Sequence, residues 1–243
     1  SDLAATTHAL IEAPSGAVIT NYSPIDFNSD YTYESTLRIG SVEVQHLWQS
    51  ENGRFSTILG GRVQFGQFQT QDVLANPTGF PFFPPILYTN PLVSQNVKSD
   101  FDHENGYAYQ NARLLDSLLL TAGLSYDHIH YPVNHRSSPV ADAVDTQDQV
   151  SPKVGLVWSP GPWTHFRGCY TKSLGGVSFD QSFRLEPNQV AGFIQSYRSL
   201  IPESVAGSVA APAFETYGLA LDHRFPTLTY VGVSAELLES QAD

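Results

Sequence analysis

The amino-acid sequence predicts an all-β protein: an antiparallel up-and-down transmembrane β-barrel, or part of one. Three observations predict this class. Apolar and polar residues alternate over long runs, short and long connections between the runs alternate strictly, and aromatic residues gather near the ends of the apolar face. A period of two places successive side chains on opposite faces of a strand. We therefore expect about eight long strands arranged in four hairpins.

Two hairpins are expected in the first half of the chain. The first pairs Leu37–Ser50 with Phe55–Asp72 across "ENG", and Asn-Gly is a strong signal for a hairpin turn. The second pairs Tyr107–Leu114 with Leu118–Tyr131 across "LDS". In each run the apolar residues alternate with polar or small ones, so each strand is predicted to have one apolar and one polar face.

Two further hairpins are expected in the second half. The third covers Ser151–Ser173 and turns at "SPGP", and the fourth pairs Phe214–Arg224 with Leu228–Glu239 around "PT". Runs of about ten residues exceed the usual five or six residues of a soluble strand. They match the roughly 9–11 residues that a tilted strand needs to cross a bilayer.

The connections between hairpins are much longer than the turns within them. They cover about Val73–Ser99, Pro132–Gln149 and Leu174–Ala213. In an up-and-down barrel this alternation places every short turn at one rim and every long loop at the other, as in outer-membrane barrels. Residues 1–30 are expected to form a lead-in segment with at most one strand, around Ala17–Tyr22, and residues 31–243 a single domain of barrel hairpins.

Alternation alone does not decide which face meets water, because a soluble cup and a membrane barrel give opposite answers. Aromatic residues cap the apolar face, as they do at membrane interfaces, and the other face is rich in Gly, Ser, Thr and Gln, which suits a polar lumen. The aromatics predicted to face lipid or its interface are Trp48, Phe65, Tyr126, Trp158, Trp163, Phe166, Tyr170 and Tyr217. The residues predicted to face the lumen are Glu43, Arg62, Gln64, Lys153, Arg167 and Asp222.

Two other classes of protein remain open at this point. One is a soluble lipocalin-like β-barrel binding module with an apolar cavity, and the other is a membrane-anchored adhesin or scaffold barrel in which only the loops matter. A chain that folds as a monomer in plain buffer would favour the soluble module. A chain that needs detergent would exclude it.

Charge and composition exclude several functions. The net charge of −12 and the lack of a basic patch argue against nucleic-acid binding. Cys169 is the single cysteine, so no intrachain disulfide is expected, and it lies among small and polar residues without a motif for a catalytic thiol. No apolar run approaches the ~18 residues of a transmembrane helix. We expect no cofactor.

The stretch "YDHIHYPVNH" is a candidate metal site at the long-loop end of a strand. It contains Asp127, His128, His130 and His135, and the predicted hairpin places His103 and Glu104 opposite them. No paired ligand motif accompanies these residues, so we interpret them as polar rim residues and predict no metal. No Gly-x-Ser-x-Gly motif occurs either, and we expect no enzymatic activity.

The loop Asn76–Pro91, "NPTGFPFFPPILYTNP", is rich in proline and aromatic residues. It is either an extracellular loop that packs on itself or a surface that recognises a ligand, since exposed aromatics often contact ligands. The sequence favours neither interpretation over the other.

Three stretches resemble TonB-dependent outer-membrane receptors. "VSPKVGLVWSPGPWTHFRGCYTKSLGG" resembles a family hairpin that begins with Ser-Pro-Lys and turns after Ser-Pro, and "ENGYAYQNARLLDSLLLTAGLSYDH" is similar to the family hairpin before it. "FRLEPNQVAGF" falls where those receptors place a Leu-x-Pro-Glu segment. The resemblance covers about Glu104–Glu239 and, more loosely, Leu37–Thr70.

The resemblance implies a receptor in the cell outer membrane that binds or takes up a small solute. Its partners would be the lipid bilayer, an unidentified solute and a TonB-type energising protein acting through a plug outside this chain. The chain departs from the family pattern, because no plug is visible, the strands fall short of a full receptor barrel, and "LLESQAD" replaces a terminal aromatic. A partial barrel is therefore expected, with a small complete barrel as the alternative.

Overall fold

The computed structural model describes residues 3–8, 26–75, 93–133, 143–175, 184–195 and 211–241. Most of these residues are in strands or in the turns between them. The described part of the chain contains no helix that is long and apolar enough to cross a membrane.

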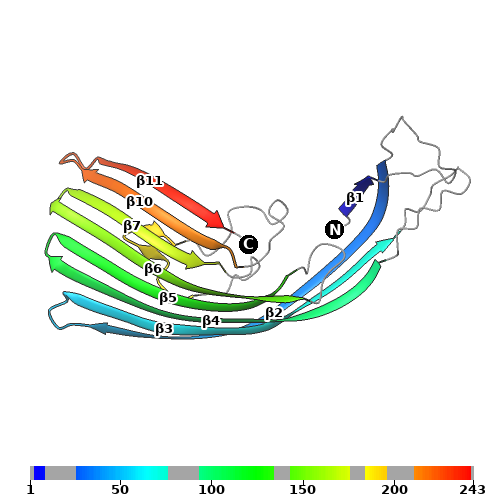
Figure 1. The fold of residues 1–243 in the computed structure, drawn as a ribbon. Coiled ribbons are helices and arrows are strands. Elements are labelled where there is room, and N and C mark those ends of the chain that lie inside the picture. The colour runs from blue at the N-terminus through cyan, green and yellow to red at the C-terminus, as the bar shows by residue number, and fades with distance from the viewer. Residues whose placement is uncertain are drawn as a thin grey trace, which may run out of the picture. The chain divides into compact units, whose positions relative to one another are not determined.

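Nine strands form one sheet in the order of the sequence (Figure 1). They are β1 (Leu3–His8), β2 (Asp26–Gln49), β3 (Phe55–Ala75), β4 (Val93–Leu115), β5 (Leu118–Pro132), β6 (Val144–Gly161), β7 (Thr164–Leu174), β10 (Ala213–Arg224) and β11 (Tyr230–Gln241). Two short strands, β8 (Gln189–Val190) and β9 (Phe193–Ile194), pair only with each other.

The predicted fold class is confirmed. Neighbouring strands of this sheet pair antiparallel, as in the register Leu118↔Trp158 between β5 and β6 and Tyr217↔Tyr170 between β10 and β7. Within the described residues β1 and β11 are the two edges of the sheet, so the strands make an open sheet of the up-and-down type.

Several strands begin earlier than the sequence predicts. β4 starts at Val93 and β6 at Val144, in stretches assigned to long connections. The reason is that the exposed face of these stretches is polar, so the hydropathy alternation disappears while the backbone pairing continues, for example at Pro132↔Val144. The strand expected at Ala17–Tyr22 and the aromatic loop Asn76–Pro91 lie outside the described residues.

The chain divides into two compact units. The first comprises residues 1–37, 68–99 and 134–143, and in it β1 pairs with the start of β2 from Leu3↔Tyr31 to His8↔Asp26. The second comprises residues 38–67, 100–133 and 144–243 and contains the larger part of the sheet together with β8 and β9. The candidate site lies wholly in the second unit.

The four short turns lie side by side at one end of the second unit. Backbone hydrogen bonds join neighbouring turns, from Arg113 N to Arg54 O at 2.7 Å, Ser159 N to Ser117 O at 2.7 Å and Arg224 N to Trp163 O at 2.8 Å. The first turn ends at Gly53, whose φ of 66° favours glycine. Short turns therefore share one rim, as the alternation of connection lengths predicts.

The sheet of the second unit has one covered and one exposed face. Along β6, Gln149, Ser151 and Lys153 are buried, while Val150 and Val154 between and beyond them are exposed. The same alternation occurs along β4, where His103, Asn105, Tyr107 and Tyr109 are buried. We call the covered face the inner face and the exposed face the outer face. Polar side chains are thus buried and apolar ones exposed, the reverse of a water-soluble domain.

Candidate functional site

A buried lysine and a buried glutamate form the centre of the inner face. Lys153 projects from β6 and is 1% exposed, and Glu186 belongs to the segment Arg184–Gln195 and is 4% exposed. Their side chains approach to 3.8 Å between Nζ and Oε1. Charged residues are almost never fully buried unless they are paired, so this contact is a specific feature of the interior.

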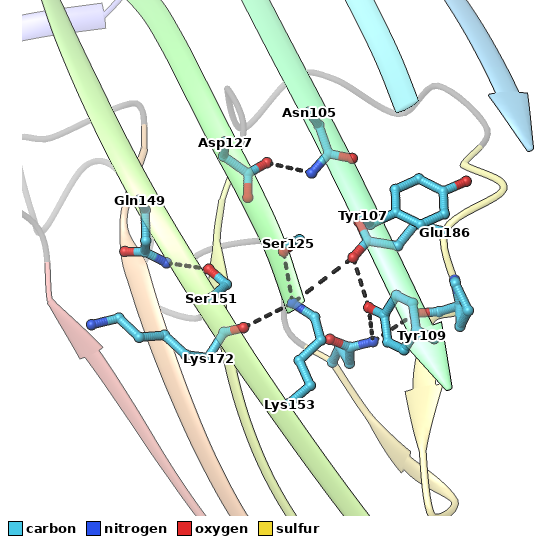
Figure 2. A network of polar contacts seen from close by, with 12 residues as sticks. Asn105, Tyr107, Tyr109, Ser125, Asp127, Gln149, Ser151, Lys153, Lys172 and Glu186 are labelled. Carbon is cyan, nitrogen blue, oxygen red and sulfur yellow. Dashed lines mark hydrogen bonds and ion pairs between the residues drawn. The ribbon is translucent and has the colours of Figure 1, made fainter. Parts of the chain in front are cut away.

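Lys153 is held by two neutral acceptors besides the carboxylate (Figure 2). Its Nζ donates to Ser125 Oγ on β5 at 2.9 Å and to the backbone oxygen of Lys172 on β7 at 2.9 Å. The register places Lys153 opposite Thr171, one residue from Lys172. Because three neighbouring strands supply these groups, the sheet itself fixes the position of the ammonium group.

Glu186 is held from the opposite side by tyrosine. Tyr109 Oη donates to Glu186 Oε1 at 2.7 Å (Figure 2). Gln195 Nε2 donates to the same Tyr109 oxygen at 3.0 Å. Burial raises the pKa of the Glu186 carboxyl, and the Lys153 ammonium and the Tyr109 hydroxyl oppose that rise. Lys153 is therefore the main charge that favours an anion at this position.

The segment Arg184–Gln195, which we call the inner segment, is anchored at its start by Glu43 of β2. Glu43 accepts hydrogen bonds from the backbone N–H groups of Leu185 at 2.8 Å and Glu186 at 3.1 Å. Gln45 Nε2 donates to the Leu185 oxygen at 2.7 Å and to Tyr107 Oη at 3.1 Å. One carboxylate and one amide thus bind three backbone groups at the start of the segment and fix it to β2.

The far end of the inner segment fits into two glycine positions of the sheet. β8 and β9 are joined by Ala191 and Gly192, which have φ values of 52° and 84°. A Cβ atom at Gly155 of β6 would lie 2.5 Å from Val190 Cγ1, and a Cβ at Gly218 of β10 would lie 2.5 Å from the Phe193 ring. Both glycines therefore make room for apolar side chains of the segment.

We expect Gly155→Ala to weaken the docking of the inner segment without unpairing the strands. The added methyl group overlaps Val190, and overpacking of this kind costs about 1–3 kcal/mol. Amide hydrogen exchange should accelerate in residues 184–195 while protection of β6 is retained. Gly106→Ala is the matched control, because a Cβ there meets nothing within 4 Å. Equal exchange in the two variants would contradict the docking described.

A second buried network lies beside the first one. His103 of β4 contacts Asp127 Oδ1 at 3.1 Å through Nε2 and Gln64 Oε1 at 3.1 Å through Nδ1. Asn105 Nδ2 donates to the same Asp127 oxygen at 2.8 Å. The Asp127 carboxylate is therefore already engaged by two neighbours.

The structure brings some of the predicted lumen residues together and separates others. Arg167 and Asp222 form an ion pair at 2.7 Å, and Arg167 Nη1 also donates to the Ala191 oxygen of the inner segment. Arg62 donates to Ser41 Oγ, and Glu43 is occupied by the inner segment. Arg62, Gln64 and Lys153 are buried on the inner face. All six residues belong to the same side of the sheet, and their assignment to a lumen stays a prediction.

The predicted interface aromatics lie on the outer face or in the turns. Tyr170 is half-buried, and the other seven are at least 38% exposed. The exposed ones are Trp48, Phe65, Tyr126, Trp158, Trp163, Phe166 and Tyr217. The rings of Trp158 and Phe166 stack with their centroids 5.3 Å apart, and the ring centroids of Tyr170 and Tyr217 are 5.1 Å apart. Trp163 lies at the end of the β6–β7 turn, where the Arg224 guanidinium lies over its ring at 5.2 Å. Their contact with lipid stays a prediction.

The candidate metal residues do not converge in the described part of the chain. His103 and Asp127 are on the inner face, whereas His128 and His130 are on the outer face with Glu104. His128 contacts Asp148 at 2.8 Å and His130 contacts Thr146 at 3.1 Å. Among the described residues no three His, Cys, Asp or Glu side chains form a group that could hold a metal ion. His135 lies outside the described residues.

Sequence reasoning did not single out Glu186, Tyr107, Tyr109 or Gln195. The tyrosines follow the alternation of β4 on its polar side, which is a signal for a role on the inner face. Glu186 stands in a long connection, and the only available signal is the "LEPNQVAGF" stretch in which it occurs.

The chain was compared with protein families, curated proteins and solved structures. The family model described as "TonB dependent receptor-like, beta-barrel" matches residues 7–210. Among solved structures, the chain is similar to the closed form of the ferric-catecholate import receptor Fiu from E. coli K12, with 12% identity and a TM-score of 0.49. That similarity covers 98% of this chain and 36% of the receptor chain. No match was found among curated proteins. Because the family model covers more than half of the 243 residues, the chain belongs to the TonB-dependent receptor-like β-barrel family.

Proposed function

We propose that this chain is part of an outer-membrane receptor that binds a small solute at its long loops and takes it up along the polar inner face. The observation that carries the proposal is the inverted sheet, in which polar and charged side chains are buried on one face and apolar side chains are exposed on the other. Outer-membrane barrels have this arrangement, with lipid outside and a polar interior. Family membership supports the receptor type.

Uptake would draw on partners beyond this chain. The inner face holds ion pairs and hydrogen bonds between its own side chains. Membership of the family supports transport that depends on solute binding and on an energising protein of the TonB type, acting through a plug domain outside this chain.

Epitope insertion tests the orientation that the proposal requires. An epitope placed after Asn52, in a short turn, should be detected only after the outer membrane is permeabilised. An epitope placed in the connection 134–142, between β5 and β6, should be detected on intact cells. The reverse pattern, or surface detection at both positions, would contradict the proposal.

Uptake itself is tested with the complete gene. Cells with and without the gene are compared for accumulation of a panel of radiolabelled small solutes, with and without a protonophore. We expect at least one solute whose accumulation needs both the gene and the proton gradient. Accumulation that is independent of the gene for every solute would argue for the adhesin or scaffold alternative.

A further inference from the structure

At the Lys153–Glu186 contact a carboxylate is bound by a cation and a hydroxyl group, as an anion is in a binding site. One carboxylate oxygen, Glu186 Oε1, lies 2.7 Å from the Tyr109 hydroxyl and 3.8 Å from the Lys153 ammonium, and the site is closed to water. A buried ammonium with only neutral acceptors is costly, so the position between Lys153 and Tyr109 requires negative charge. The neighbouring carboxylate Asp127 is already engaged by His103 and Asn105.

The carboxylate that fills the site belongs to a segment that the sheet does not need for its own pairing. β8 and β9 pair only with each other, and side-chain contacts connect the inner segment to the large sheet. β7 and β10 meet directly at Leu174↔Ala213, and Gly175 N donates to Pro212 O at 2.8 Å. The inner segment can therefore leave the inner face without separating any two neighbouring strands.

Three polar atoms of the inner segment and of the inner face lack hydrogen-bond partners among the described residues. Gln195 Oε1 and the hydroxyl groups of Thr171 and Thr216 are buried without a hydrogen-bond partner in the described part of the chain. Thr171 pairs with both Lys153 and Thr216 across the sheet, so the three residues belong to one row of the inner face. Buried polar groups without partners cost free energy, and withdrawal of the segment removes that cost for Gln195 Oε1.

We propose that Lys153 and Tyr109 form a binding site for a carboxylate-bearing solute, and that Glu186 is its built-in occupant, which the solute replaces when the inner segment withdraws. The Lys153 ammonium supplies the charge, the Tyr109 hydroxyl donates a directional hydrogen bond, and the strands hold both groups in place. Glu186 acts as an internal competitor. The solute would have to bring enough contacts of its own to displace the segment.

The role of this site in uptake rests on the proposed function, but the site can be tested on purified protein. Glu186→Ala removes the built-in carboxylate and leaves Lys153 and Tyr109 in place. Thermal unfolding is followed with sodium acetate, with acetamide as the neutral analogue, and with sodium chloride at equal ionic strength. In this variant, acetate at ten times its dissociation constant should raise the melting temperature by about 3 °C or more above acetamide and chloride.

Two proteins serve as controls for the rescue by acetate. The unchanged chain should show no such difference, because Glu186 already fills the site. The double variant Glu186→Ala, Lys153→Met should show none either, because the cation is gone. Equal melting temperatures of Glu186→Ala in acetate, acetamide and chloride would overturn the proposal. Stabilisation of the double variant by acetate would overturn it too.

A second measurement tests withdrawal and does not need Glu186→Ala to fold. Gly155→Cys and Val190→Cys, combined with Cys169→Ser, place two thiols at positions where a Cβ at residue 155 and Val190 Cγ1 lie 2.5 Å apart, so that a disulfide can fix the segment. Acylation of Lys153 by a small water-soluble amine reagent is measured by mass spectrometry. The unchanged chain is acylated in parallel, because a side chain at position 155 by itself weakens the docking of the segment. Both the unchanged chain and the reduced double-cysteine protein should react at least tenfold faster than the oxidised protein, and an unchanged chain that reacts as slowly as the oxidised protein would overturn the proposal. Neither measurement involves uptake, so an absence of transport in cells would leave both results valid.

Discussion

Replacing Lys153 with methionine is expected to lower the free energy of unfolding by about 3–5 kcal/mol. The substitution removes the ammonium group that lies 3.8 Å from the buried Glu186 carboxylate, and leaves that carboxylate only the weaker electrostatic effect of Arg184. It also leaves Ser125 Oγ and the Lys172 oxygen without the donor that they share. Reversible urea unfolding in detergent or lipid vesicles measures the loss.

Two comparisons separate the charge from the packing. The double variant Lys153→Met, Glu186→Gln should recover much of the loss, because neutral groups cost far less to bury than an unpaired carboxylate. Lys172→Met is the matched control, since Lys172 and its partner Glu215 are each 31% exposed and lie 3.3 Å apart. Exposed pairs contribute about 0–1 kcal/mol. Equal losses for Lys153→Met and Lys172→Met would contradict the account of the buried pair.

Replacing Val154 with arginine should cost about 2–4 kcal/mol if the outer face meets lipid, as arginine does near the middle of a bilayer. Val154 is 47% exposed, so the cost cannot come from overpacking an interior. It lies between Val150 and Trp158, within the apolar part of β6. On a water-exposed surface the same change would have an effect of roughly 0.5 kcal/mol or less.

Val144 supplies the control for this prediction. It belongs to the same strand and the same face and is 46% exposed, but Asp148 lies between it and the apolar part of the strand. Val144→Arg should therefore cost about 0–1 kcal/mol, as expected near or beyond the membrane interface. The two variants are compared in vesicles by equilibrium unfolding. Equal costs at positions 144 and 154 would contradict the lipid assignment.

Much of the fold could be predicted from the sequence because hydropathy alternates with the period of a strand. The turns at "ENG" and "SPGP" and the pairing of the two halves of each hairpin follow from local signals. The starts of β4 and β6 could not be predicted in this way, since both faces of Val93–Ser99 and Val144–Asp148 carry polar residues. There the strand is maintained by backbone pairing with its neighbours, which leaves no hydropathy signal.

The candidate site was harder to predict than the fold. Lys153 could be placed on the polar face by counting along its strand, but its partner Glu186 belongs to a connection far along the chain. A connection has no periodicity, and which strands it packs against depends on the tertiary structure. Counting along β4 shows that His103 and Glu104 take opposite faces, which is why His103 joins Asp127 and cannot reach His128.

The central claim is that the two faces of this sheet meet different solvents. Nitroxide labels at Leu219 and Ile194 test it directly, because both side chains are large, apolar and exposed, at 71% and 62%. Leu219 is on the outer face of β10, and Ile194 is in the inner segment. In the complete chain reconstituted in bilayers, we expect the label at Leu219 to collide mainly with oxygen and the label at Ile194 mainly with a water-soluble nickel chelate. Preferential collision of the Leu219 label with the nickel chelate would contradict the claim.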